Sequence, residues 1–419
     1  MNIKREDIEI MSPAGNFEAL QAAIQGGADS VYFGVGELNM RSHSANNFLI
    51  DDLPKIVEIC RVNGVKSYLT LNIIIYDNEI EQMRQTVDAA CRAGVSAIIA
   101  SDMAVIQYAR KVGMEVHIST QLNVSNIESV RYHSQFADVI VLARELTLTQ
   151  IKNIGEAIRR EQIKGPSGRL VALELFCHGA LCMAVSGKCY LSLHQYNASA
   201  NRGACYQICR RGYQVTDLET GMQLEIDNKY IMSPKDLCTI EFIDKILDAG
   251  VTVLKIEGRA RSAEYVKYVT SAYRSAVDAV CNGTFSKEMA AELKQRLSTV
   301  FNRGFWDGYY QGAKIGEWSN VYGNKATRRK RYVGKVTNYF SNLSVAEVLI
   351  ETGELCQGDT VLISGPSTGV IECNVEEIRV DLKVAVKAVK GEYCSIPITG
   401  GVKLRRSDKV YIWEKSDVS

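Results

Sequence analysis

The sequence predicts an α/β protein built on a TIM-like (β/α)8 barrel, with a cysteine-rich insertion and a small C-terminal antiparallel β-barrel domain. Short apolar runs alternate with amphipathic stretches between residues 8 and 256, and six of the twelve cysteines fall within residues 177–238. From residue 331, short β-type runs with turn signals replace the alternation. Alternating strands and helices are typical of a parallel α/β fold, although a doubly wound open sheet gives a similar pattern. We place the barrel at residues 1–325, the insertion at about 177–238 and the β domain at 326–419.

Eight apolar runs have the length and residue types of buried strands. They cover residues 8–11, 30–34, 66–71, 97–101, 115–119, 138–143, 171–176 and 252–256. Six helix-like segments lie between them, at residues 16–25, 52–62, 79–93, 103–112, 125–135 and 147–160. Gly64, Gly94 and Gly113 follow three of these segments, as expected for left-handed helix C-caps ahead of a new strand.

The interval between the seventh and eighth strands is about 75 residues, far longer than an ordinary crossover. It contains the clustered cysteines and a predicted hairpin, with strands at 213–215 and 224–226 around a turn at 219–221. An insertion at the carboxyl end of a barrel strand lies on the face where barrel enzymes carry out their chemistry. We therefore expect the insertion to form part of an active site.

After the eighth strand, the pattern predicts helices at 263–281 and 286–300, followed by a glycine-rich segment at 301–312. The remaining chain contains the runs YVGKV, AEVLI, DTVLI, VAVKA and KVYIW, separated by turn signals. Because no helix pattern interrupts these runs, they predict a separate antiparallel barrel or sandwich.

The composition is that of an ordinary globular protein, with 46% hydrophobic and 23% charged residues and a net charge of +1. This balance excludes the overall basic character of a strongly cationic nucleic-acid binder, so any RNA contact depends on local patches. No run reaches the roughly 18 apolar residues of a membrane span, and the charged N-terminal segment has no signal-peptide core. We expect a cytoplasmic protein with no membrane partner.

The clustered cysteines are Cys177, Cys182, Cys189, Cys205, Cys209 and Cys238. Because cytosolic thiols are kept reduced, a disulfide framework is the weakest explanation, and metal or redox chemistry leads. The separations of 4, 6, 15, 3 and 28 residues match neither paired zinc knuckles nor the C-x2-C-x2-C ferredoxin run. On spacing alone, an iron–sulfur cluster, a zinc site, a catalytic thiol and buried unreactive cysteines all stay open.

The residues around these cysteines resemble those of the U32 peptidase-like (collagenase-like) family. Glu174 precedes an H-G-A-L-C run ending at Cys182, and G-K-C ends at Cys189. N-R-G-A-C and K-D-L-C follow, ending at Cys205 and Cys238. The resemblance extends to SPAGN at 12–16, GADSVYFG at 27–34, KIEGR at 255–259 and FNRGF at 301–305, so it covers essentially the whole chain.

The resemblance implies that four cysteines hold a [4Fe–4S] cluster. Carried over by motif, its ligands are Cys182, Cys189, Cys205 and Cys238. Cys209 is a candidate substitute for one of them, and Cys177 is interpreted as a thiol beside the ligands or the substrate. The alternative interpretation of each is a small buried hydrophobic residue.

The chain is most similar to the family's tRNA 5-hydroxyuridine hydroxylation proteins. This implies oxygen-independent, prephenate-dependent hydroxylation of the wobble uridine at C5, with tRNA and a small-molecule oxygen donor as partners and prephenate as the expected co-substrate. The resemblance also leaves open a peptidase acting on collagen-like substrates, a 23S rRNA cytidine hydroxylase and a non-catalytic iron–sulfur scaffold. A U32 paralogue or a second copy of the chain is the expected protein partner.

Polar residues at the carboxyl ends of barrel strands need partners when buried, and a substrate can supply them. The alternative is that they cap helices or pair with one another. The candidate catalytic residues are His178, Glu174, Arg259, Arg41, Asn72 and Gln121. A bidentate carboxylate site suits Arg41 and Arg259, and the alternative for each is an internal ion pair.

Local basic patches are the candidate RNA contacts. They contain Arg328, Arg329, Lys330 and Arg331, together with Arg210 and Arg211. The first group lies where the chain passes from the barrel to the β domain, so a solvated linker is the alternative interpretation. No H-E-x-x-H motif occurs, so a zinc-protease mechanism has no support in the sequence.

Overall fold

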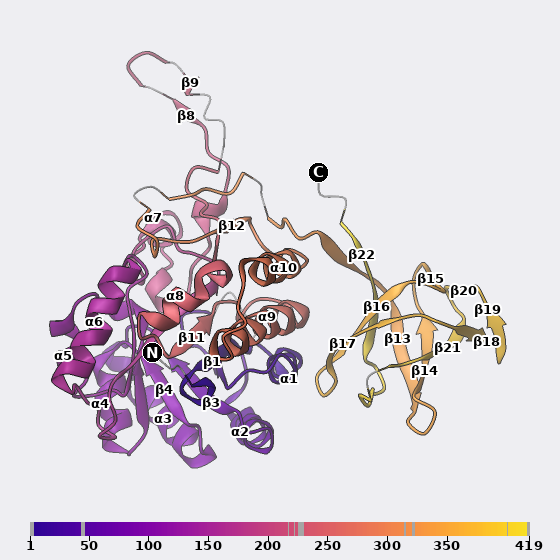
Figure 1. Cartoon of the computed structure of the whole chain (residues 1–419), viewed down its shortest axis with the longest axis horizontal. Coiled ribbons are helices and arrows are strands. Elements are labelled where there is room, and N and C mark those ends of the chain that lie inside the picture. Colours follow the sequence, from indigo (N-terminus) through magenta and orange to yellow (C-terminus); the bar gives the residue numbers. More distant parts are fainter. Residues whose placement is uncertain are drawn as a thin grey trace.

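The fold is that of a computed structural model, which describes residues 4–42, 47–216, 218–221, 223–224, 230–313, 316–320, 323–399 and 401–416. Eight parallel strands form a closed barrel, because β11 pairs with both β1 and β7 (Figure 1). This confirms the predicted TIM-like barrel. The barrel strands are β1 (Glu9–Pro13), β2 (Ser30–Phe33), β3 (Lys66–Leu71), β4 (Ala97–Ala100), β5 (Glu115–Ile118), β6 (Val139–Val141), β7 (Ala172–Gly179) and β11 (Val253–Ile256).

Helices cover the outside of the barrel and bury one face each. In α3, for example, Met83, Val87 and Ala90 are buried at helical spacing, and Gly94 ends the helix at a φ of 81°. None of the helices in the described part of the chain is long and apolar enough to span a bilayer. The helices are α1 (Phe17–Gln25), α2 (Leu53–Val62), α3 (Ile80–Ala93), α4 (Met103–Lys111), α5 (Ile127–His133), α6 (Leu148–Glu161), α8 (Ile243–Asp248), α9 (Ala263–Cys281) and α10 (Lys287–Leu297).

The insertion between β7 and β11 extends the barrel sheet by one short strand. Strand β7 runs to Gly179, beyond the predicted end at 176, because Gly179 and His178 pair with β10 (Asp236–Cys238). β12 (Phe305–Trp306) then adds beside β10. These two short strands and α8 were not predicted, since each is shorter than the windows in which periodicity is visible.

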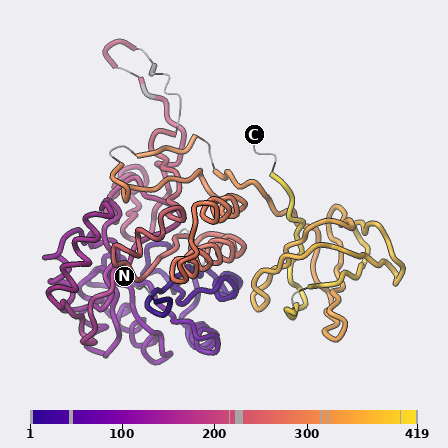
Figure 2. Tube along the Cα trace, in the orientation of Figure 1, coloured from indigo at the N-terminus to yellow at the C-terminus, as the bar shows by residue number. Residues whose placement is uncertain are grey.

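The rest of the insertion contains α7 (Leu191–Tyr196) and the predicted hairpin, whose strands are β8 (Val215–Thr216) and β9 (Gln223–Leu224). Residues 225 and 226 of the predicted second strand lie outside the described residues. The hairpin projects away from the barrel (Figures 1 and 2). The insertion that carries it begins at the carboxyl end of β7.

The C-terminal region is antiparallel β structure, as predicted, with its own apolar core. The order of its main sheet is β17-β16-β22-β13-β14-β21-β18-β19, and β15 pairs with β20. The strands are β13 (Arg328–Phe340), β14 (Val345–Ile350), β15 (Glu354–Cys356), β16 (Thr360–Gly365), β17 (Gly369–Asn374), β18 (Ile378–Val380), β19 (Lys383–Ala385), β20 (Lys387–Val389), β21 (Tyr393–Pro397) and β22 (Lys409–Lys415).

This sheet packs against the side of the barrel. The side chain of Gln25, at the end of α1, donates to the backbone oxygen of Thr368 at 2.7 Å and accepts from the amide of Val370 at 3.0 Å. Lys267 in α9 donates to the Val370 oxygen at 2.6 Å. The linker interpretation of residues 328–331 is wrong, because these residues begin β13 and pair with β22.

Candidate active site

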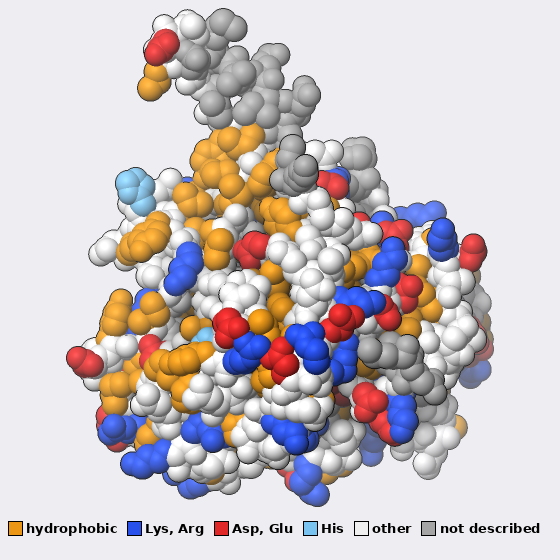
Figure 3. Space-filling view, turned by 60° about the vertical axis from the view of Figure 1, so that its left-hand side comes forward, with side chains coloured by type: hydrophobic (Ala, Val, Ile, Leu, Met, Phe, Trp, Pro, Cys, Tyr) orange, Lys and Arg blue, Asp and Glu red, His pale blue; other side chains and the backbone are white. Residues whose placement is uncertain are grey.

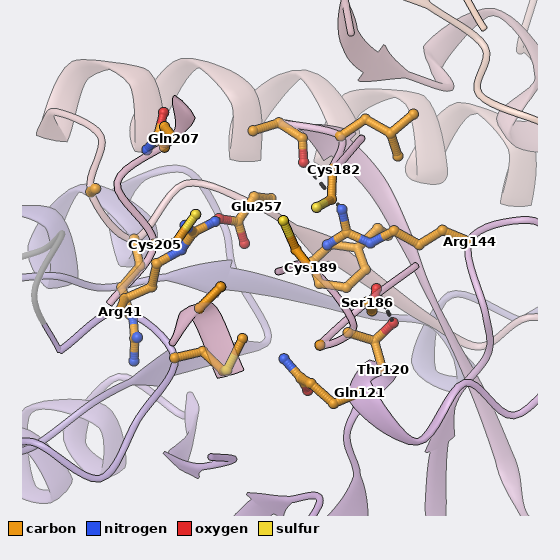
Figure 4. Close-up of a pocket in the computed structure, with 18 of the residues that line it drawn as sticks. Arg41, Thr120, Gln121, Arg144, Cys182, Ser186, Cys189, Cys205, Gln207 and Glu257 are labelled. Atoms are coloured by element: carbon orange, nitrogen blue, oxygen red, sulfur yellow. Dashed lines mark hydrogen bonds and ion pairs between the residues drawn. The ribbon is translucent and has the colours of Figure 1, made fainter. Parts of the chain in front are cut away.

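A cavity of about 250 Å3 lies at the carboxyl ends of the barrel strands. Tyr32, Thr70, Phe176 and Lys255 line it from β2, β3, β7 and β11, and residues of the insertion line the opposite side. Side chains from both parts converge in Figure 4. The cavity therefore occupies the position where barrel enzymes place substrates.

The N-R-G-A-C segment of the insertion is anchored by an ion pair and a glycine. Arg202 binds Glu79 in a fork, with one of its two contacts at 2.7 Å, and its guanidinium lies 4.2 Å from the centre of the Tyr76 ring. Gly203 has a φ of 83°, and a Cβ there would lie 2.6 Å from the backbone oxygen of Asn39. Only glycine allows this close crossing, which brings Cys205 to the cavity.

The H-G-A-L-C segment uses a second glycine to leave β7. Gly179 has a φ of 106°, and a Cβ there would overlap the backbone oxygen of Glu257. The chain turns at this point, so that Ala180, Leu181 and Cys182 line the cavity. The motif residues around both cysteines are thus explained by the path of the backbone.

Four thiols line the cavity: Cys182, Cys189, Cys205 and Cys209. In Figure 4, Cys182 and Cys189 lie near Arg144, and Cys205 lies near Arg41. Each of the twelve cysteines, all of them within the described residues, is a free thiol. Three of the four predicted cluster ligands are therefore brought together, and Cys209 joins them.

Cys238, the fourth predicted ligand, does not line the cavity. It is 2% exposed and lies opposite His178 in the β10–β7 pair. Burial raises the pKa of its thiol to about 12, and Tyr273 in α9 is its side-chain hydrogen-bond partner. Cys177 is fully buried, and its Sγ lies 3.4 Å from the backbone oxygen of Lys255. Both thiols behave as buried core groups.

The donor set distinguishes a cluster from a single ion. Among the residues that the structure describes, no three His, Cys, Asp or Glu side chains converge closely enough to hold one metal ion. A [4Fe–4S] cluster takes four thiolates, each on a different iron, so its ligands stand further apart than those of one zinc ion. Four thiols around one cavity fit that donor set in number and chemistry.

The cavity is strongly cationic. Its lining contains Glu257 as the one carboxylate among the described residues. Glu257 pairs with Arg41 at 2.6 Å. Burial by itself would raise the pKa of Glu257, but Arg41 and Arg144 lower it to about 2. The lining cations are Arg41, Arg144, Arg210, Lys255, Arg259, Arg261 and Arg303.

The guanidiniums of Arg259 and Arg144 make hydrogen bonds only to neutral groups in the described structure, although both lie near enough to Glu257 to lower the pKa of its carboxyl. Arg259 is 4% exposed and donates to Thr70 Oγ1 at 2.5 Å and to Asn39 Oδ1 at 2.6 Å, while its Nε has no partner. Burial lowers its pKa to about 10. Arg144 lies 3.8 Å from the centre of the Phe176 ring and donates to the Ala180 oxygen at 3.2 Å, and its Nε is also without a partner.

Arg210 and Arg261 extend this pattern. Arg210 donates to the backbone oxygen of Leu181 at 2.7 Å and to Ser233 Oγ at 3.0 Å, and Arg261 lies over the Phe301 ring at 3.5 Å. Burial lowers the pKa of both guanidiniums. We call Arg144, Arg210, Arg259 and Arg261 the unpaired cavity arginines. None of these four forms an ion pair in the described structure, and the lining as a whole sets seven cations against one carboxylate. Partly desolvated charge that is not balanced is costly, so the cavity is suited to an anionic ligand.

Of the other predicted residues, Asn72 and Gln121 also line the cavity and lie 3.5 Å apart, Nδ2 to Oε1. Glu174 and His178 do not line it. Glu174 is fully buried and accepts from Lys255 Nζ at 2.7 Å. Burial lowers the pKa of His178 to about 3, so its ring is neutral and packs against Tyr273 and Phe305.

Several cavity residues were not predicted from the sequence, among them Arg144, Lys255, Arg261 and Arg303. Arg144 follows the sixth strand directly, and its position at a carboxyl strand end was a usable signal. Lys255 lies inside the last barrel strand, where a lysine is expected only with a partner such as Glu174. Pairing across strands is not readable from one sequence.

The basic patches differ from the cavity. Arg328 pairs with Glu372 at 3.6 Å, and Lys330 pairs with Glu264 at 3.0 Å. Arg329 and Arg331 share Glu414, at 2.9 and 3.2 Å. Arg211 is exposed and lies 5.5 Å from the centre of the Tyr196 ring, whereas Arg210 is part of the cavity. The predicted RNA contacts therefore fall into separate regions with different charge balance.

Comparison with known proteins identifies relatives over the full length. A family model described as "Peptidase family U32" matches residues 15–320. A Porphyromonas gingivalis protein named "Collagenase" is 59% identical over 100% of both chains. "tRNA hydroxylation protein P1" of Bacillus subtilis is 34% identical over 88% of this chain and 86% of its own, and the Escherichia coli "23S rRNA 5-hydroxycytidine C2501 synthase" is 34% identical over 76% and 47%. The chain therefore belongs to peptidase family U32.

Proposed function

We propose that this protein is an RNA hydroxylase that converts a tRNA wobble uridine to 5-hydroxyuridine without molecular oxygen. The observation that carries the proposal is a single cavity that combines four thiols with the unpaired cavity arginines. Similarity to a relative named for tRNA hydroxylation, over most of both chains, supports the choice of substrate. An rRNA cytidine is the related alternative, because another relative is named for that product.

The arginines are proposed to bind the oxygen donor. Replacing C–H by C–OH is a two-electron oxidation, so the reaction needs a donor that delivers oxygen and is itself reduced. Prephenate, the co-substrate implied by the resemblance, carries two carboxylates, and we propose it as this donor. Arg259 and Arg144 offer planar N–H groups that match carboxylates, and both have N–H groups to spare.

The thiols are proposed to hold a [4Fe–4S] cluster, with Cys182, Cys189, Cys205 and Cys209 as ligands. A cluster of this type supplies one-electron chemistry beside the substrate. Cys209 replaces Cys238 in this assignment, since the Cys238 side chain contacts Tyr273 and lies outside the cavity lining. Asn72 and Gln121 supply neutral hydrogen-bonding groups at the same cavity, which suit the edge of a base.

A peptidase acting on collagen-like substrates is the second candidate, favoured by the 59% identity to a relative named collagenase. Nucleophilic catalysis by a cavity thiol needs a base within hydrogen-bonding reach. No described histidine lines the cavity, and His178 is buried with its pKa lowered to about 3. The geometry therefore favours hydroxylation over hydrolysis.

Nucleoside mass spectrometry tests the proposal. RNA from a strain lacking the gene is compared with RNA from the same strain carrying the wild-type gene. We expect 5-hydroxyuridine-derived nucleosides to disappear from tRNA and to return on complementation. Unchanged tRNA would overturn the proposal. Loss of 5-hydroxycytidine from 23S rRNA instead would make an rRNA cytidine the substrate. Hydrolysis of gelatin by iron-free purified protein would favour the peptidase.

A further inference from the structure

The part of the insertion that lines the cavity also carries several exposed apolar side chains. Tyr190 is 73% exposed and Tyr206 is 56% exposed, and Tyr196 is 48% exposed. Met183 and Val185 are exposed beside them, at 42% and 45%. We call these five residues the aromatic rim. Figure 3 shows hydrophobic side chains gathered at the base of the projecting hairpin, in the region of the insertion.

The aromatic rim is continuous with the cavity along the chain. Met183 itself lines the cavity while remaining exposed. Tyr190 follows the lining residue Cys189, and Tyr206 follows Cys205. A molecule lying on the rim therefore has its next group within reach of the thiols.

The rings are presented with their surfaces accessible. Tyr196 and Tyr206 meet edge to face, with ring centroids 5.5 Å apart, and both side chains stay about half exposed. Arg211 lies over the Tyr196 ring at 5.5 Å. In the described structure Tyr190 makes no ring contact or side-chain hydrogen bond, although it is the most exposed of the three. Such exposure of large rings marks an interaction surface.

Charge identifies the kind of partner. Residues 175–216 contain four Lys or Arg side chains and no Asp or Glu. Lys188 and Arg211 are exposed, and the described structure gives neither of them an ion pair. Aromatic rings combined with cations and no carboxylates suit a flexible polyanion whose units have flat faces. An apolar polypeptide would use the rings but not the excess charge.

We propose that the aromatic rim binds an unpaired RNA strand by stacking its bases on Tyr190 and Tyr206, with Lys188 and Arg211 contacting the phosphates. The proposal rests on the proposed function and names how the target RNA is held. Bases on either side of the target would stack on the rim, so that the base between them enters the cavity. The protein would thus require an unpaired segment and read little sequence outside it.

Binding measurements with purified protein test the proposal. Fluorescence anisotropy compares a stem-loop RNA carrying an unpaired loop with a fully paired duplex of the same composition. The variants are Tyr190→Ala/Tyr206→Ala and Tyr190→Phe/Tyr206→Phe. Tyr393→Ala is the matched control, since Tyr393 is 54% exposed on β21 and lacks a described ring contact.

We expect the double alanine variant to bind the stem-loop at least about 10-fold more weakly, because each stacked base contributes about 5-fold to about 100-fold in affinity. The double phenylalanine variant keeps the stacking faces and should bind like wild type, as should Tyr393→Ala. Duplex binding should change little in any variant. Wild-type affinity in the double alanine variant, or equal weakening with phenylalanine, would overturn the proposal.

The proposed function and the rim proposal can each be overturned without the other. If the double alanine variant restores tRNA hydroxylation as well as wild type does, the rim proposal is wrong and the function stands. If the deletion leaves the RNA unchanged while loop binding still depends on the tyrosines, the function is wrong and the rim binds RNA for another purpose. Tyrosine-dependent binding of a collagen-like peptide, without RNA binding, would overturn the rim proposal in favour of a polypeptide.

Discussion

The cavity and the start of β13 both concentrate arginine, and they differ in what faces each guanidinium. Arg328–Arg331 lie along a strand whose neighbours supply Glu372, Glu414 and Glu264, so every cation there has a carboxylate within 4 Å. Arg144 and Arg259 instead face a ring, a carbonyl or neutral side chains. In the first region the cations form ion pairs that join the strand to its surroundings. In the second region the cations remain available to a ligand.

This difference teaches that a basic segment in a sequence is not a measure of free positive charge. The run RRKR is the densest in the chain, yet three carboxylates offset most of its charge. The cavity arginines are scattered over more than a hundred residues, from Arg144 to Arg261, and act together only because barrel strands end at one face. The following predictions test whether the contrast holds.

The largest effect is expected at the thiols that share the cavity with these arginines. Cys209→Ser should lose most of the iron bound by anaerobically purified protein, because Cys209 lines the cavity. Cys238→Ser should keep it, because Cys238 faces the helix layer at Tyr273. Iron and sulfide analysis, with circular dichroism to check folding, measures both. The reverse result would assign the fourth ligand to Cys238.

A large effect on activity is expected at Arg144. Arg144→Met should lower kcat/KM for tRNA hydroxylation by about 100-fold, equivalent to about 3 kcal/mol, because a buried guanidinium–carboxylate contact is lost. Stability should change by no more than about 1 kcal/mol, since Arg144 forms no ion pair in the described structure and Glu257, whose pKa it lowers, keeps its ion pair with Arg41. Arg144→Lys keeps the charge but not the planar fork, so its kcat/KM should lie between those of wild type and Arg144→Met. Wild-type activity in Arg144→Met would remove the distinction between the two regions.

A moderate effect of pH is expected at Glu257. Its pKa is about 2 when folded and about 4.3 when unfolded, so its carboxylate stabilises the fold fully above about pH 4.3 and less as pH falls toward 2. The difference in unfolding free energy between wild type and Glu257→Gln should therefore shrink by about 1 kcal/mol between pH 5 and pH 3.5. Urea unfolding at the two pH values measures it. A difference that does not depend on pH would show that Arg41 does not hold this carboxylate.

The smallest effect is expected in β13. Arg329→Met/Arg331→Met should lower the unfolding free energy by about 1 kcal/mol or less, since these partly exposed residues share one carboxylate, Glu414. The affinity for tRNA and its salt dependence should stay as in wild type. A salt slope reduced by about one for each arginine removed would mean that β13 contacts phosphates, and the contrast would break.

Much of the fold was readable from the sequence. The barrel strands are short apolar runs such as AIIA in β4, buried on both faces, and turn signals bound them. The β domain was recognised by the change of pattern after residue 331. Strands β10 and β12 were not readable, because they have three and two residues and pair only through β7. The end of β7 lies beyond its predicted position for the same reason, because its last residues pair with β10.

The candidate site was predicted in part. Cys182, Cys189 and Cys205, and the polar residues Arg41, Asn72, Gln121 and Arg259, all line the cavity. His178 and Glu174 belong to the same motif but lie in a strand that is buried on both sides. Proximity in a motif therefore says little about which side chains reach the cavity.

By itself, the sequence determined the barrel, the position of the insertion and the chemistry of the residues brought to the active face. Local periodicity and turn chemistry carry that information, because they act over a few neighbouring residues. Only the tertiary structure decided which thiols meet and which arginines lack a carboxylate. Those properties depend on distances between residues far apart in the chain, and burial then sets the cost of leaving each charge alone.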